Sequence, residues 1–136
     1  MTSKTSTQLL PQYGATPRYE TRRNPSRKTR GAELAAIAHR LGTPLMSWQE
    51  QVANVGLEVL EDGTPAYREI VVTVPRQSGK TALVLAWEVH RALAWGSAQA
   101  IAYTAQTGFD ARRKLMDDQV PALQNSSLAP TIRRIY

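Results

Sequence analysis

The residues Gly79-Lys80-Thr81 have the types and the order that are needed to hold the phosphate groups of a nucleotide. A glycine lets the backbone approach phosphate oxygens closely, a lysine can bridge the β and γ phosphates, and a threonine hydroxyl can bind Mg²⁺. Pro75 and the residues Arg76-Gln77-Ser78 precede this tripeptide, so the candidate nucleotide-binding loop covers residues 75–81. We therefore expect ATP and Mg²⁺ as ligands, with Thr81 as the protein ligand to the metal.

The segments on either side of this loop are those that a phosphate loop requires. Residues 70–74 are all β-branched and show no polar alternation, which predicts a strand buried on both faces. Residues 80–95 are strong helix formers with apolar side chains around most of the circumference, which predicts a largely buried helix that ends at Gly96. A loop that enters a helix presents backbone N–H groups and the positive end of the helix dipole to phosphate. An incidental turn is the alternative, since Gly-Lys-Thr by itself arises often by chance.

The remaining elements predict an α/β fold. Apolar spacing predicts helices over 32–41 and 48–55, and Ser47 and Glu50 stand in a capping-box arrangement before the second of these. Two strands are expected over 57–60 and 67–74, joined at Asp62-Gly63, followed by a strand over 98–105 and a helix over 109–116. The order strand, helix, strand, helix after residue 67 predicts a right-handed βαβ unit with a parallel sheet.

The loop departs from the usual phosphate-loop pattern at two positions. The first glycine of that pattern would stand five residues before Gly79, where this chain has Val74, and Arg76 lies inside the loop. A loop of the form Arg-x-x-Gly-Lys-Thr/Ser without the first glycine resembles the deviant Walker A motif of phage terminase large subunits, the DNA-packaging ATPases. The resemblance implies a RecA-like (ASCE) P-loop core and makes Arg76 a cis arginine finger on the γ-phosphate. Pairing of Arg76 with phosphate or a nearby carboxylate alone is the alternative.

Two further segments resemble the same family. Trp48-Gln49 is similar to the adenine-recognition motif upstream of the loop, in which the Gln49 amide would contact the adenine edge. A core tryptophan beside a surface glutamine is the alternative. Residues 103–107, Tyr-Thr-Ala-Gln-Thr, resemble the motif that ends the next strand near the ligand crevice. The likeness covers residues 45–118 and implies double-stranded DNA, a portal protein and a small terminase subunit as partners in the host cell cytoplasm.

The acidic residues that an ATPase of this class needs are not recognisable in the sequence. Asp117-Asp118 follows a predicted helix rather than an apolar strand, so it does not fit the Walker B pair that binds Mg²⁺ and activates water. The acidic cluster of the family's nuclease domain is absent as well. We therefore expect residues 31–136 to be the N-terminal portion of a P-loop ATPase domain, truncated, which does not turn over ATP alone.

The net charge of +6 is concentrated in residues 1–30, which hold seven basic residues and one acidic residue. We expect these residues to form a disordered basic arm, either a solvated tail or a segment that binds DNA or a partner. The absence of cysteine excludes disulfides and thiol catalysis, and no apolar run is long enough to span a membrane. Two other functions stay open: a non-catalytic nucleic-acid or protein-interaction module with a vestigial loop, and another P-loop motor such as a helicase.

Overall fold

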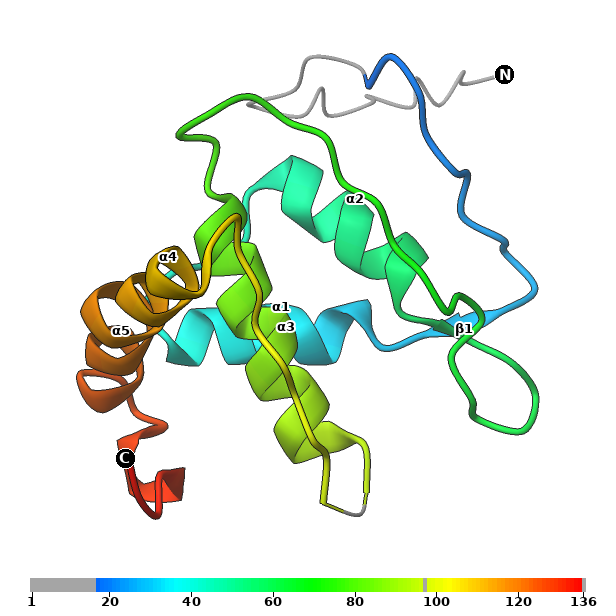
Figure 1. Cartoon of the computed structure of the whole chain (residues 1–136). Coiled ribbons are helices and arrows are strands. Elements are labelled where there is room, and N and C mark those ends of the chain that lie inside the picture. Colours follow the sequence, from blue (N-terminus) through cyan, green and yellow to red (C-terminus); the bar gives the residue numbers. More distant parts are fainter. Residues whose placement is uncertain (1–16, 97, 136) are drawn as a thin grey trace, which may run out of the picture.

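Three helices form the centre of the protein in the computed structural model, which describes residues 17–96 and 98–135 (Figure 1). Helix α1 (Gly31–Arg40) packs against both α2 (Ser47–Gly56) and α3 (Lys80–Ala94). A second helical segment consists of α4 (Gly108–Arg113), the π-helix η1 (Lys114–Gln119) and α5 (Val120–Gln124), followed by the short 3-10 helix η2 (Ala129–Thr131). In this part of the chain no helix is both long and apolar enough to cross a lipid bilayer.

The core is formed where the apolar faces of these helices meet. Leu34, Ile37 and Ala38 recur at helical spacing on α1 and are buried, as their pattern predicts. The glycine at the end of α2 permits close packing, because a Cβ on Gly56 would lie 2.7 Å from the ring of Trp87 on α3. The same core includes Leu128, which follows α5 and is fully buried.

The sheet formed by the described residues consists of two short antiparallel strands. Strand β1 (Lys28–Thr29) pairs with β2 (Glu58–Val59), with Lys28 opposite Val59. The predicted turn at Asp62-Gly63 follows β2, and it places Pro65 in an isolated bridge with Val59. The chain therefore reverses near the predicted position, but the return segment does not continue as a strand.

The predicted α/β fold, a RecA-like P-loop core with a parallel sheet, is wrong for this structure, which is 47% helix and 4% strand. Residues 70–74 and 98–105 are extended, but neither segment pairs with another described segment. Their side chains are not buried on both faces either, because Val71 is 80% exposed and Ile101 is 43% exposed. A β-branched or apolar run favours extended backbone, but it becomes a strand only beside a second strand. The two segments adjoin opposite ends of α3 and do not meet (Figure 1).

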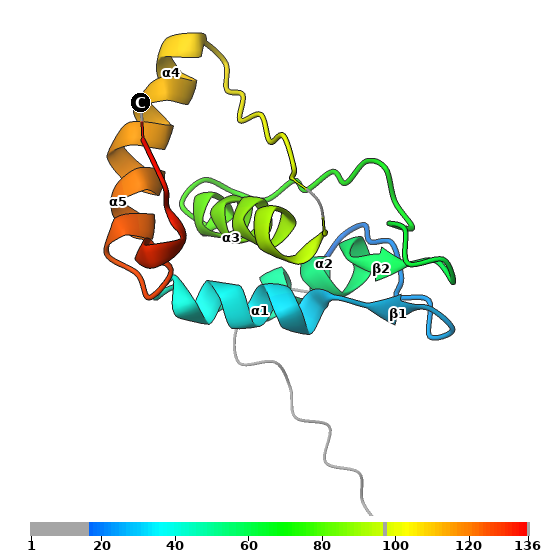
Figure 2. The same ribbon diagram turned by 90° about the horizontal axis from the view of Figure 1, so that it is seen from below.

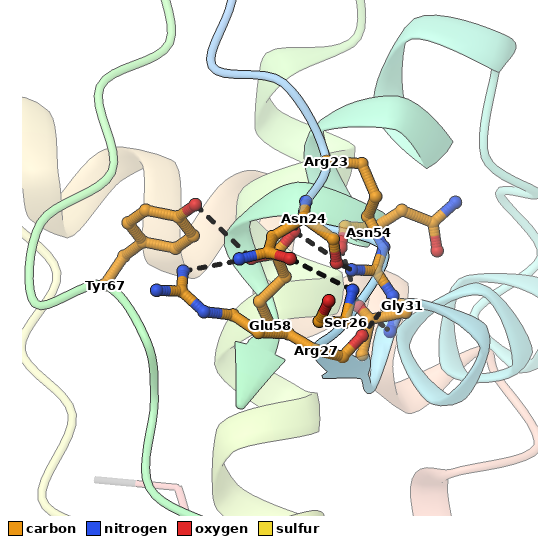
Figure 3. Close-up of polar contacts among 9 residues, drawn as sticks. Arg23, Asn24, Ser26, Arg27, Gly31, Asn54, Glu58 and Tyr67 are labelled. Atoms are coloured by element: carbon orange, nitrogen blue, oxygen red, sulfur yellow. Dashed lines mark hydrogen bonds and ion pairs between the residues drawn. The ribbon is translucent and has the colours of Figure 1, made fainter. Parts of the chain in front are cut away.

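A buried carboxylate joins the N-terminal segment to this fold (Figure 3). The side chain of Glu58 on β2 is fully buried, and Oε1 accepts hydrogen bonds from Arg23 at 3.0 Å and from the Asn24 backbone N–H at 2.7 Å. Its Oε2 accepts from Arg27 and from the Tyr67 hydroxyl, each at 3.3 Å. Burial raises the pKa of Glu58, but the bonds from Asn24, Arg23 and Arg27 outweigh it, so the pKa lies below its ordinary value of 4.5.

Part of the predicted disordered arm is therefore bonded to the body of the protein. Besides Arg23 and Arg27, Arg30 forms an ion pair with Glu33 and lies over the Trp95 ring at 4.6 Å. Residues 1–16 of the predicted arm lie outside the described residues. Several of the charges that suggested a nucleic-acid-binding arm thus have partners within the chain.

We predict that Glu58→Gln lowers the free energy of unfolding at pH 7 by roughly 3 kcal/mol, because it leaves two guanidinium groups around a neutral amide. A group whose folded pKa is lowered stabilises the protein above its unfolded pKa, and that stabilisation is lost as the pH falls through the folded pKa. Urea unfolding of the wild type should therefore show stability declining below about pH 4.5, and the gap between wild type and variant should narrow there. Glu61→Gln, at an exposed position in the following turn, is the control. Equal stability of the two variants at pH 7 would contradict the structural role of Glu58.

Candidate functional site

The candidate phosphate loop lies between the extended residues 70–74 and α3, at the N-terminus of a 15-residue helix (Figure 1). The helix begins at Lys80, as the sequence predicts, and Gly79 is its N-cap with φ of 87°. Gln77 also has a positive φ of 60°, an uncommon conformation for a residue with a side chain. Because the first N–H groups of a helix have no acceptor inside it, they point outward at this loop and favour an anion.

The Lys80 side chain folds back across the loop that precedes it. Its Nζ donates to the carbonyl oxygens of Val74 at 2.9 Å and Pro75 at 2.6 Å. The Ser78 hydroxyl donates to the same Pro75 carbonyl at 2.7 Å, which closes the loop. No described carboxylate forms an ion pair with Lys80, so its charge is held by carbonyl dipoles alone. A phosphate could therefore accept hydrogen bonds from the Lys80 ammonium group without first breaking an ion pair.

Gln49 connects α2 to the loop. Its side chain is 2% exposed, Oε1 accepts from the Met46 backbone N–H at 2.7 Å, and Nε2 donates to the Gly79 carbonyl at 2.9 Å. The predicted capping box of Ser47 and Glu50 is wrong by one position. Met46 is the N-cap, and Gln49, three residues later, accepts from the Met46 backbone N–H. Since both ends of the Gln49 amide are bonded inside the chain, the structure gives it a positioning role. Its contact with adenine stays a prediction.

The other predicted loop residues face solvent. The side chains of Arg76, Gln77 and Thr81 are exposed, and Thr81 lies on the first turn of α3. Within the described ranges Arg76 forms no ion pair. Exposure leaves its guanidinium accessible to a bound phosphate.

The structure does not bring the segment 103–107 to the loop. Thr107 is instead the N-cap of α4, where its Oγ1 accepts from the Asp110 backbone N–H at 3.0 Å. Figure 2 shows the end of this segment and the start of α4 away from the N-terminus of α3. Asp118 of the acidic pair lies on η1 and accepts from Lys114 at 2.6 Å. Among the described residues no group of three or more acidic or histidine side chains could hold a metal ion.

Comparison with known proteins adds no relative: no family model, no curated protein and no solved structure matches the chain. Its function is therefore inferred from its own residues. The Gln49–Gly79 hydrogen bond joins residues 30 positions apart, and the sequence does not reveal it.

We predict that Gly79→Ala destabilises the protein by roughly 2 kcal/mol, from backbone strain at positive φ together with crowding. A Cβ there would lie 2.9 Å from both Gln49 Nε2 and Met46 Cε. Gly42→Ala is the matched control, because Gly42 has φ of 80° and a Cβ added to it would meet no atom within 4 Å, so strain alone should cost roughly 1 kcal/mol. Urea unfolding measures both values. Equal losses would show that Gln49 and Met46 do not constrain the loop.

Proposed function

We propose that residues 75–81 bind the phosphate groups of ATP, with Mg²⁺ held at Thr81. The observation that carries this proposal is the position of the Lys80 ammonium, which lies on the carbonyls of Val74 and Pro75 beside a helix N-terminus. A cation, free N–H groups and the positive end of a helix dipole converge there, and together they favour a multiply charged anion.

Phosphate binding would exchange bonds that the loop already makes. The β and γ phosphate oxygens replace the two carbonyls as acceptors for Lys80, and the N–H groups of the first turn of α3 donate to the same oxygens. The Gly79 carbonyl accepts from Gln49 Nε2 on α2 and from the Leu83 backbone N–H on α3, so both helices would hold the loop in place while the ligand binds. Arg76 is exposed and would reach the γ-phosphate.

We further propose that the chain is the nucleotide-binding part of a DNA-packaging motor of the terminase large-subunit type. The combination of Val74 at the position of the first glycine and Arg76 within the loop supports this assignment over other P-loop motors. The motor would act in the cytoplasm of an infected cell on double-stranded DNA, with a portal protein and a small terminase subunit as partners. Arg76 would act there as a cis arginine finger.

We predict that Lys80→Ala weakens binding of Mg-ATP by about 2 kcal/mol, or roughly thirtyfold, because the charge-assisted bonds to phosphate are lost. Isothermal titration of the 136-residue chain measures this change. Lys28→Ala removes the same charge from an exposed position on β1 and should leave the affinity unchanged. If the wild type itself does not bind Mg-ATP, and the two variants behave like it, the loop is vestigial. That result would favour the alternative of a non-catalytic interaction module.

We predict that Thr81→Ala reduces ATP affinity when Mg²⁺ is present but not in EDTA, because the hydroxyl acts only through the metal. The Thr81 side chain is exposed, so its removal should leave the unfolding midpoint close to that of the wild type. Titrations with and without Mg²⁺ give the two affinities. An equal loss under both conditions would exclude Thr81 as a metal ligand.

A further inference from the structure

The Gln49 amide, for which the sequence predicts a contact with adenine, is held inside the chain. Its Oε1 accepts from the Met46 backbone N–H at 2.7 Å, and its Nε2 donates to the Gly79 carbonyl at 2.9 Å. Only 2% of the residue is exposed. A hydrogen bond to the edge of a base would have to replace a bond that the amide already makes, so it would add little affinity.

Met46 places an apolar surface beside the same loop. A Cβ added to Gly79 would lie 2.9 Å from Met46 Cε, so the tip of this thioether lies at the N-cap of α3. Figure 1 shows the start of α2 next to that end of α3. Met46 is also 46% exposed, which leaves part of its side chain open to a ligand. A methionine side chain adapts its shape and makes favourable contacts with aromatic rings.

Gln77 is the other side-chain amide of the loop. It is exposed, whereas the side-chain hydrogen bonds described within the loop are made by Ser78 and Lys80. A site discriminates strongly between similar ligands where polar groups that are fixed in place pair with the ligand's edges. The loop therefore presents its fixed polar groups to phosphate, and an apolar side chain lies beside it.

We propose that the site takes purine nucleoside triphosphates without selecting adenine, because the loop binds the triphosphate and Met46 packs against the base. Adenine and guanine share the purine ring and differ at their edges, which would stay in solvent. This inference rests on the proposed function of residues 75–81. It changes the role of Gln49 from reading adenine to positioning Gly79, so GTP should bind as tightly as ATP.

Isothermal titration of the full 136-residue chain with the Mg²⁺ complexes of ATP, GTP and ribose 5-triphosphate tests this inference. The dissociation constants of ATP and GTP should agree within about threefold. Ribose 5-triphosphate lacks the base and should bind roughly fivefold more weakly. A larger preference for either nucleotide overturns the inference, and so does equal binding of ribose 5-triphosphate. If none of the three ligands binds, the proposed function fails and this inference fails with it.

Met46→Ala tests the packing of the base. The variant keeps the backbone N–H that bonds Gln49, so it should weaken ATP and GTP alike, roughly fivefold, and leave ribose 5-triphosphate unaffected. Leu60→Ala is the matched control, because Leu60 is 43% exposed and follows β2, and it should bind both nucleotides like the wild type. Unchanged nucleotide affinity in Met46→Ala overturns the proposal.

Gln49→Leu tests the positioning role of the amide at similar side-chain volume. The variant loses the bond to the Gly79 carbonyl and should weaken ATP and GTP by the same factor, so the ratio of the two affinities stays at its wild-type value. A loss confined to ATP would show that Gln49 reads adenine and would overturn the proposal. The wild-type comparison of the three ligands decides the matter if either variant does not fold.

Discussion

The fold depends on a charge that has been removed from water. A carboxylate buried as fully as that of Glu58 is stable only if donors surround it, and here they come from a segment before α1 and from a tyrosine after β2. The chain must therefore bring Arg23, Arg27 and Tyr67 to one point. That requirement sets where the N-terminal segment enters the helical core and where the chain leaves β2 toward the loop.

Helix α2 connects the buried Glu58 carboxylate to the candidate nucleotide site. Glu58 follows its C-terminal end, and Gln49 lies in its first turn with its amide bonded to Gly79. The helix is roughly 15 Å long, so it acts as a rigid connection between the buried carboxylate and the loop. Trp87 of α3 lies against Gly56 at the other end of α2, which fixes the angle between the two helices. The loop conformation is thus supported from both ends of one helix.

The sequence predicts the local features of this arrangement better than the long-range ones. Apolar spacing and the glycines at 42, 56 and 96 predict the three central helices, because helix formation depends on neighbouring residues. The prediction of a parallel sheet is wrong because β-branched residues determine backbone shape without specifying a partner strand. The role of Glu58 is not predicted, since its carboxylate acts through arginines distant in sequence. A charged residue within the apolar run 57–60 is the only local signal for Glu58.

The extended residues 70–74 have a further consequence for how the protein behaves at high concentration. Their backbone N–H and C=O groups form no ladder within the described chain, and Val71 is 80% exposed. Such an edge is a template on which another molecule can add a strand and begin a fibril. Charged residues flank it on both sides, Arg68-Glu69 before it and Arg76 after it. Charged residues that flank an apolar extended segment oppose strand addition. Arg76, which we propose to contact phosphate, therefore also opposes aggregation.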